Sequence, residues 1–264
     1  MKNVIILTKR FDGTVSQFAF NLNKQIKDCS VTIIIEETHT TLFDKLVNQY
    51  KNVKKHGLIW FPYRLFVLIR KIFSSSQHPV SSEPSEDILI ENGVEILEVA
   101  DYHDDIFLES LRAKKPTLGI VFGTGILKPK LFEIPEQGMI NIHQGKIPDY
   151  RGQPPAFWEL YNSESEVGLS VHCVAEKLDA GDLIFQTSLP ISESDTIESL
   201  QTKLDKIVIN EVPTVANDFI MGLVKPVKID TKIGKVYSKP TLRQMYKLTK
   251  LRKKLMKNTV KIRK

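Results

Sequence analysis

Residues 1–36 read MKNVIILTKRFDGTVSQFAFNLNKQIKDCSVTIIIE, and this stretch predicts the class of fold. Residues 4–7 are a short apolar run, and residues 31–35 are rich in β-branched side chains, which pack well in a buried strand. Between these runs, apolar side chains recur at the four-residue spacing of one helix face: Phe18, Leu22 and Ile26. Because a strand, a helix and a second strand follow one another, the chain opens like a parallel, doubly wound sheet.

The rest of the chain continues this alternation. Apolar runs predict further strands at residues 94–99, 118–122, 139–142, 169–174 and 183–189. We therefore predict an α/β, Rossmann-like fold with a mostly parallel sheet and helices on both faces. We expect one domain over residues 1–222 and a short basic C-terminal extension over residues 223–264.

Helical patterns lie between the predicted strands. They cover residues 41–73, with a break near Gly57, and shorter stretches at 107–111 and 128–134. A long helix is expected to begin near Asp195, with Glu198 three residues on, and to end or kink at Pro213. The polar, Ser- and Pro-rich residues 74–87 indicate a loop.

Charge is spread unevenly along the 264 residues. The whole chain carries a net +6, but residues 225–264 hold 15 Lys and Arg against one acidic residue, a local net of +14. The preceding part holds 22 basic and 30 acidic residues, a net of −8. This asymmetry predicts an anionic partner, which could be a phosphorylated substrate, a nucleic acid or a membrane surface.

Several classes of protein do not fit the sequence. The two cysteines, Cys29 and Cys173, lie in no CxxC or Cys/His cluster, which argues against a structural zinc site and favours the reducing cytoplasm. The N-terminus resembles a buried strand more than a secretory signal. The most apolar stretch, residues 58–73, is interrupted by charges and Pro62, so it is too short to span a bilayer. It fits a core or substrate-wall helix, or a segment lying on the inner membrane face.

Residues 138–186 contain the candidate chemistry. Asn141 and His143 alternate on a predicted strand, so their side chains point to the same face. They stand where the strand gives way to a Gly- and Pro-rich loop, at the sheet edge where ligands bind in open parallel sheets. Asp179 lies in a second loop, LDAGD (178–182). An amide donor, an imidazole and a carboxylate suit acyl transfer to an amine, which needs oxyanion stabilisation and proton transfer.

The patterns NIH (141–143), PDYRG (148–152), SVH (170–172) and LDAGD together resemble the folate-dependent formyltransferase family. The resemblance is clearest over residues 117–204. Members of that family formylate glycinamide ribonucleotide, methionyl-tRNA or nucleotide-linked amino sugars. The resemblance implies direct transfer of a formyl group from 10-formyltetrahydrofolate to an amine, without a metal. It also implies that Asn141 polarises the formyl carbonyl, His143 is the general acid/base, and Asp179 supports it.

The resemblance assigns further residues. Asp182 is the alternative to Asp179 and is otherwise expected at the folate site. The segment that walls the pterin in the family corresponds to Phe122, Gly123, Gly125, Ile126 and Leu127. Substrate contacts are expected from Lys9, Arg10, Arg151, Ser170 and His172, although Arg151 could equally be a surface charge.

Departures from the family pattern bear on the acceptor. After His143 this chain has QGKIP (144–148) in place of PSLLP, and a glycine two residues after the histidine resembles the amino-sugar enzymes. Too few residues follow the last long helix to build the β-barrel of the tRNA enzyme. We therefore expect a phosphorylated or nucleotide-linked amino sugar as acceptor. The alternatives are a methionyl-tRNA formyltransferase that uses its basic tail, and a non-catalytic binding protein on the same fold.

The tail itself supports more than one interpretation. Residues 241–264 combine leucines with many lysines, which suits a solvated helix, a membrane-surface helix or a nucleic-acid contact. The sequence leaves a homodimer open.

Overall fold

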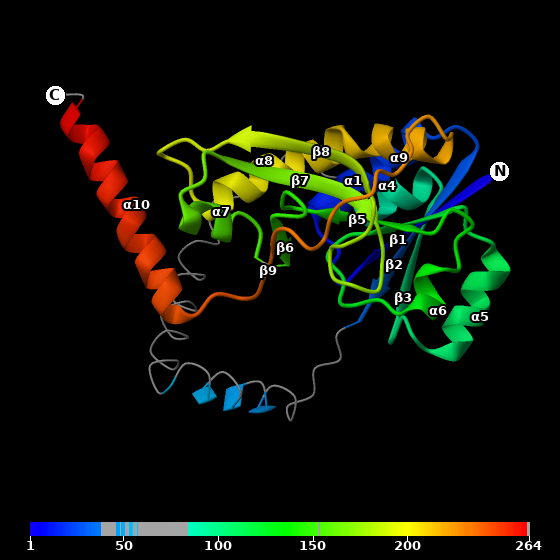
Figure 1. Ribbon diagram of the computed structural model, residues 1–264. Coiled ribbons are helices and arrows are strands. Elements are labelled where there is room, and N and C mark those ends of the chain that lie inside the picture. Colours follow the sequence, from blue (N-terminus) through cyan, green and yellow to red (C-terminus); the bar gives the residue numbers. More distant parts are fainter. Residues whose placement is uncertain are drawn as a thin grey trace.

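The computed structural model describes residues 1–37, 84–152 and 154–262, together with positions 46, 47, 49, 50, 53, 54 and 57, and side chains up to residue 252. Its main feature is a seven-stranded sheet with the order β3-β2-β1-β4-β5-β7-β8 (Figure 1). The strands are β1 Lys2–Thr8, β2 Cys29–Glu36, β3 Val94–Val99, β4 Leu118–Val121, β5 Met139–His143, β7 Glu166–Cys173 and β8 Leu183–Pro190.

The direction of the strands changes at β5. The five strands from β3 to β5 are parallel, whereas β7 pairs antiparallel with β5 and β8 pairs antiparallel with β7. The mostly parallel sheet predicted from the sequence is therefore confirmed, and only β7 runs against the other six strands. Because β7 and β8 are antiparallel neighbours, the loop of residues 174–182 can join them without a crossover helix.

Helices cover both faces of the sheet. One core cluster joins the sheet to α1 Gly13–Gln25, α4 Glu86–Glu91, α8 Ile197–Asn210 and α9 Val212–Ile220. The other joins it to α5 Asp105–Lys114 and α6 Pro129–Phe132. Alternate residues of β1 divide between the two clusters, because successive side chains of a strand point to opposite faces. The continuous apolar run in β1 thus reflects burial on both faces.

Local capping explains where the helices begin. Asp12 caps α1 by accepting the N–H of Val15. Helix α8 begins one residue later than predicted, because Thr196 rather than Asp195 is its N-cap and forms a capping box with Ser199. Asp195 instead accepts hydrogen bonds from neighbouring side chains. The predicted break at Pro213 is confirmed: α8 ends at Asn210, and α9 carries the proline in its first turn.

The long connection after β2 is described only in part. The six helical positions among residues 46–54 agree with the predicted helix, and Gly57 has a φ of +72° just beyond them. Residues 58–73 and most of the predicted loop 74–87 lie outside the described residues. The end of that loop is a correction: Ser85 caps α4, so Glu86 and Asp87 form the first turn of a helix. No helix in the described part of the chain could cross a membrane.

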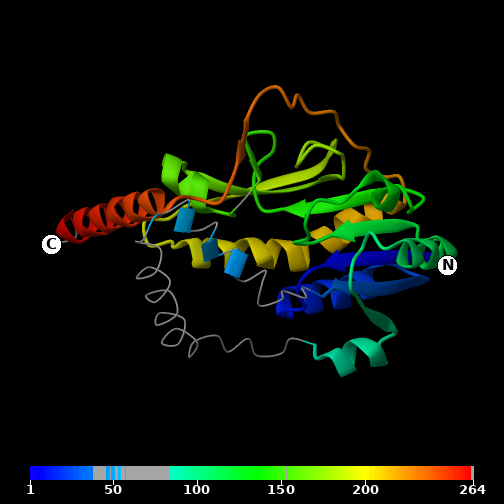
Figure 2. The same ribbon diagram turned by 90° about the horizontal axis from the view of Figure 1, so that it is seen from below.

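The basic extension contacts the rest of the molecule along its length. Val227 pairs with Leu183 of β8, and β9 (Lys235–Tyr237) pairs in parallel with β6 (Tyr150–Gly152). The last helix, α10 (Leu242–Ile262), packs near α7 (Phe157–Asn162), and its Leu248 is buried in the core. Its C-terminal half extends away from the sheet in both views (Figures 1 and 2). The division at residue 222 stays a prediction.

Candidate active site

Four polar side chains meet at the end of β5 because of the strand register. In the antiparallel pair of β5 and β7, Asn141 lies opposite His172 and His143 lies opposite Ser170. Residues two apart on a strand share a face, and directly opposite residues lie side by side. The structure therefore brings Asn141 and His143 together with two of the predicted substrate-binding residues.

Asp179 completes this group from the loop between β7 and β8. Its Oδ1 accepts a hydrogen bond from Nδ2 of Asn141 at 3.2 Å, and its Oδ2 accepts one from the backbone N–H of Gly152 at 2.7 Å. The same carboxylate lies 3.5 Å from Nδ1 of His143 and 3.6 Å from Nε2 of His172. Each of the three residues assigned to catalysis thus contacts another.

The loop brings Asp179 into contact with Asn141 and His143, while the choice between Asp179 and Asp182 for catalysis stays a prediction. Asp179 has a φ of +45°, in the left-handed region. Any side chain on Gly181 would collide with the carbonyl oxygen of Cys173, only 1.7 Å from the position of a Cβ atom, so a glycine is required there. The carbonyl of Asp182 accepts the N–H of Cys173; burial raises the pKa of the Cys173 thiol, and the charge of Asp182 adds to this effect.

Burial sets the charge state of the group. Desolvation lowers the pKa of His143, which is only 8% exposed, although the charge of Asp179 acts in the opposite direction. Burial also acts to raise the pKa of Asp179, but the side chains of His172 and His143 and the N–H of Gly152 outweigh it and leave the pKa lowered. At neutral pH the site therefore holds a carboxylate beside a mainly neutral imidazole at His143.

The loop after β5, residues 144–152, is called the strap below. It crosses His143, because the backbone carbonyl of Tyr150 lies 2.7 Å from Nε2 of that residue. A Cβ atom on Gly145 would lie 2.5 Å from the Tyr150 oxygen and 2.6 Å from His143 Nε2. Only a glycine at this position allows the strap to lie so close to the imidazole.

Ser170 of β7 binds the strap, and His172 of the same strand binds Asn141. The fully buried hydroxyl of Ser170 donates to the carbonyl of Gly145 at 2.7 Å and accepts the N–H of Ile147 at 3.2 Å. Nδ1 of His172 donates to the carbonyl of Cys173 at 2.8 Å, which leaves Nε2 to accept a hydrogen bond from Asn141 at 3.2 Å. Both side chains are thus engaged by groups of the protein, and their predicted contacts with the substrate stay predictions.

The segment after β4 lies beside Asn141, since Val121 pairs with Asn141 in the sheet. Phe122 and Leu127 are buried, whereas Ile126 is 76% exposed and presents an apolar surface to solvent. Gly123 has a φ of +75°, and no atom of the described residues lies within 4 Å of where its Cβ would be. These features suit the predicted wall of a flat ring.

The basic residues after β1 differ in their surroundings. Lys9 pairs with Glu36 at 2.6 Å, and its ammonium lies 3.4 Å from where a Cβ on Gly125 would be, next to the predicted folate segment. Arg10 is exposed and pairs with Asp12 at 3.0 Å.

Arg151 is not a surface charge. Its side chain is 9% exposed, and it donates to the carbonyl of Thr231 at 3.3 Å. Its Nε is buried and has no hydrogen-bond partner among the described residues. The contact with Thr231 ties the strap to the C-terminal extension.

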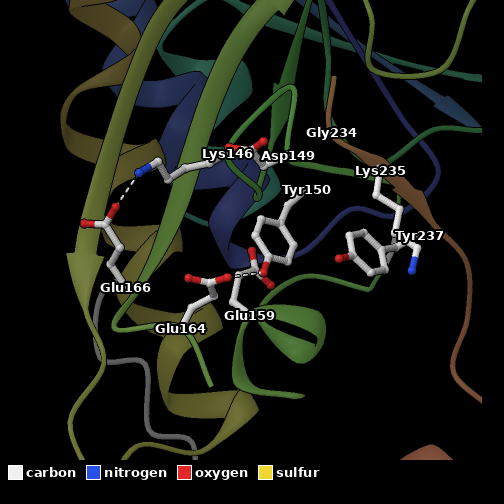
Figure 3. A pocket seen from close by; sticks show the side chains of 9 residues that line it. All are labelled: Lys146, Asp149, Tyr150, Glu159, Glu164, Glu166, Gly234, Lys235 and Tyr237. Atoms are coloured by element: carbon white, nitrogen blue, oxygen red, sulfur yellow. Dashed lines mark hydrogen bonds and ion pairs between the residues drawn. The ribbon is translucent and has the colours of Figure 1, made fainter. Parts of the chain in front are cut away.

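A pocket of about 340 Å³ lies against the outer side of the strap (Figure 3). It is lined by Lys146, Asp149, Tyr150, Glu159, Glu164, Glu166, Gly234, Lys235 and Tyr237. Sequence reasoning missed this pocket and the Tyr150 carbonyl. The signal for Glu159 was available, because it is the single acid within the aromatic run AFWELY (156–161). Among the residues that the structure describes, no cluster of His, Cys, Asp and Glu could hold a metal ion.

Comparison with known proteins gives one family. A family model described as formyl transferase matches residues 70–215. The methionyl-tRNA formyltransferase of Bacteroides thetaiotaomicron is 29% identical over 154 residues, which are 57% of this chain and 47% of that protein. That of Halalkalibacterium halodurans is 35% identical over 114 residues, 43% of this chain and 36% of that protein. The chain thus spans about half the length, or less, of these curated relatives.

Solved structures share the fold across nearly the whole chain. A sugar N-formyltransferase from Shewanella has a TM-score of 0.59 at 17% identity, covering 94% of this chain and 87% of that one. Glycinamide ribonucleotide transformylase 1 from Symbiobacterium toebii has a TM-score of 0.60 at 16% identity, covering 86% of this chain and 95% of that one. These likenesses confirm the predicted fold.

Proposed function

We infer the function from one premise: this chain belongs to the formyl transferase family, whose model matches more than half of its residues. We propose that it transfers a formyl group from 10-formyltetrahydrofolate to an amine. The observation that carries this proposal is the contact of Asn141, His143 and Asp179 at the carboxyl end of β5. That edge is where ligands bind in open α/β sheets.

The proposed chemistry is a direct transfer. The acceptor nitrogen attacks the formyl carbon, a new C–N bond forms, and the bond between that carbon and N10 of the folate breaks. Asn141 donates an N–H to the oxyanion of the tetrahedral intermediate. Neutral His143 takes the proton from the amine and gives one to the leaving nitrogen, while Asp179 stabilises the imidazolium. The folate supplies the activated formyl group, and the residues from Phe122 to Leu127 would hold it.

We propose that the acceptor is an amino sugar that carries phosphate. The glycine two residues after His143, which resembles the amino-sugar enzymes, packs directly against the imidazole. A groove of about 810 Å³ between α7 and α10 is lined by Arg243, Lys247 and Lys250 and by no acidic residue. None of these cations pairs with a carboxylate in the described part of the chain. Such a groove favours phosphate groups.

A second candidate acceptor is methionyl-tRNA. The curated relatives are methionyl-tRNA formyltransferases, and the sequence continues the basic spacing of α10 with Lys254, Lys257 and Lys261. Binding of tRNA through these residues would fall steeply with salt concentration. A membrane contact by α10 has less support, because Met245 and Leu248 pack against the body and so occupy the apolar side of its first turns.

The test is a transfer assay with 10-formyltetrahydrofolate and three acceptors: UDP-linked and dTDP-linked 4-amino sugars and methionyl-tRNA. Mass spectrometry detects the formamide, and His143→Ala is the matched variant. A formylated sugar supports the proposal, whereas formylation of tRNA alone supports the second candidate. No transfer, combined with no binding of 5-formyltetrahydrofolate, would support the non-catalytic binding protein instead.

A further inference from the structure

The pocket against the strap is built by side chains outside the catalytic group. Figure 3 shows the rings of Tyr150 and Tyr237 side by side, with the carboxylates of Glu159 and Glu164 next to Tyr150. The two rings stack with centroids 5.2 Å apart at an interplanar angle of 7°. The volume of about 340 Å³ lies at the lower end of the range for small-molecule sites, ~300–1,000 Å³.

Glu159 is the feature of this pocket that points to a ligand. Its side chain is only 4% exposed, yet it has no side-chain partner among the described residues and interacts with its own backbone N–H. Burial raises its pKa to about 7, and the charge of Glu164 adds to the effect. Buried carboxyl groups normally have several hydrogen-bond partners, so one that lines a pocket and has only its own backbone N–H as partner among the described residues marks a candidate binding site.

The other lining groups define what such a ligand must offer. Glu166 pairs with Lys146, and Glu164 accepts a hydrogen bond from the Tyr150 hydroxyl at 2.6 Å. The lining holds four carboxylates against two lysines, and ionised carboxylates only accept hydrogen bonds.

The aromatic side of the pocket adds a second requirement. The ring of Tyr237 stacks with the rings of Tyr150 and Trp158, and the ammonium of Lys235 lies 5.2 Å from its centroid. A ligand with hydroxyl donors and an apolar edge to set against these rings meets both requirements.

Tyr150 connects this pocket to the candidate base. Its ring lines the pocket, and its backbone carbonyl contacts Nε2 of His143 at 2.7 Å. Only Tyr150 itself therefore links a molecule seated against its ring to the imidazole of His143. The pocket and the base also share the strap, which β9 and Ser170 hold in place.

We propose that this pocket is the subsite for the sugar ring of the acceptor, an inference that rests on the proposed function. The hydroxyl groups of the ring donate to Glu159 and Glu164, the ring lies beside Tyr150, and its amine faces the strap that contacts His143. Glu159 acts as a specificity-determining residue and takes no part in the transfer itself.

The experiment separates ring binding from nucleotide binding by calorimetry. UDP-N-acetylglucosamine is compared with UDP alone, because the acetylated amine neither titrates nor reacts. We expect the wild type at pH 8 to bind the sugar nucleotide at least about tenfold more tightly than UDP, the effect of one or two hydrogen bonds to a charged group. Glu159→Gln should remove most of this preference. Glu109→Gln, at an exposed position of α5, should retain it.

The pH dependence gives a second readout. At pH 6 Glu159 gains a proton, so the preference of the wild type should shrink, whereas that of Glu159→Gln should not change. Asp149, Glu164, Glu166, Lys146 and Lys235 also face the pocket, and the comparison with Glu159→Gln separates their titration from that of Glu159. Glu164→Gln, at an exposed carboxylate, provides a second variant should Glu159→Gln fold poorly.

Equal binding of the two nucleotides by the wild type would overturn the proposal, as would an unchanged preference in both variants. Binding of 5-formyltetrahydrofolate to the same samples is recorded in parallel. Loss of folate binding would contradict the proposed function, whereas a missing sugar preference would contradict the pocket alone.

Discussion

The backbone carbonyl of Tyr150 accepts a hydrogen bond from Nε2 of His143 at 2.7 Å, so this nitrogen of the candidate base is already engaged by the protein itself. Because a carbonyl oxygen only accepts hydrogen bonds, Nε2 must carry the proton in this arrangement. Both N–H groups of the Asn141 amide are also engaged, one by Asp179 and one by His172. An acceptor amine that approaches Nε2 therefore has to take the place of the Tyr150 carbonyl.

The protonation of His143 should follow its burial. Since burial lowers the pKa of this residue, we expect the NMR titration of its ring protons to have a midpoint below the ordinary value of ~6.5. His143→Ala identifies the signal and should reduce turnover by about 10²–10⁴-fold. The contribution of neutral His143 to the free energy of unfolding is complete above about pH 6.5 and is lost as the pH falls through the folded pKa. A midpoint at or above 6.5 would contradict this account.

Replacing Asp179 should affect both stability and catalysis. Asp179→Asn removes the buried charge that accepts hydrogen bonds from the Gly152 N–H and the Asn141 amide. We therefore expect a loss of about 1–3 kcal/mol in the free energy of unfolding. Turnover should fall by about 10²-fold or more, because the imidazolium loses its counter-charge. Thermal unfolding and the transfer assay measure the two effects. Asp182→Asn is the matched control, and equal losses in the two variants would refute the assignment to Asp179.

The Asp179 carboxylate also predicts the direction of acid sensitivity. Its lowered folded pKa means that its stabilising contribution is present above the unfolded value of ~3.9 and is lost as the pH falls through the folded pKa. In Asp179→Asn this part of the acid dependence should disappear. Chemical denaturation at several acidic pH values measures it, and parallel curves for wild type and variant would count against the prediction.

A methyl group at Gly145 should disturb the base without unfolding the protein. The added Cβ of Gly145→Ala would meet the Tyr150 carbonyl at 2.5 Å and His143 Nε2 at 2.6 Å, so the strap or the imidazole must move. We expect turnover to fall by about tenfold or more, while 5-formyltetrahydrofolate binds as in the wild type. Circular dichroism checks the fold. Unchanged turnover would show that the strap moves freely.

Donor binding is tested at Gly125. Among the described residues, only the end of the Lys9 side chain lies within 4 Å of a Cβ at this position, so a larger side chain would extend into the space expected for the pterin. Gly125→Trp should abolish calorimetric binding of 5-formyltetrahydrofolate, whereas Gly125→Ala should retain it. Binding that survives the tryptophan would place the donor elsewhere.

Sequence patterns predicted the sheet well because buried strands are continuous apolar runs. The order of the motifs also placed Asn141, His143 and Asp179 at one edge, since the ends of neighbouring strands meet there. Their contacts agree with that placement, while their roles stay predictions. The N-cap of α8 was displaced by one residue because Asp195 and Thr196 are both good caps, and only tertiary contacts decide between them.

Other features left no pattern to recognise. The contact between the Tyr150 carbonyl and His143 involves a backbone atom, which no residue type reveals. The three-residue strands β6 and β9 are too short for an alternating pattern, and their partners lie about 85 positions apart. The use of the Ser170 hydroxyl within the strap likewise depends on how two distant loops pack.

The pairing of β6 with β9 has one more consequence, for the motion of the molecule. The N–H of Gly152 donates to Asp179, while the α-carbon of Gly152 packs so closely against the carbonyl of Tyr237 that no side chain fits between them. Detachment of β9 would therefore remove the packing that holds the Gly152 N–H beside the Asp179 carboxylate. Hydrogen exchange at this single amide would report how often the end of the chain and the catalytic centre open together.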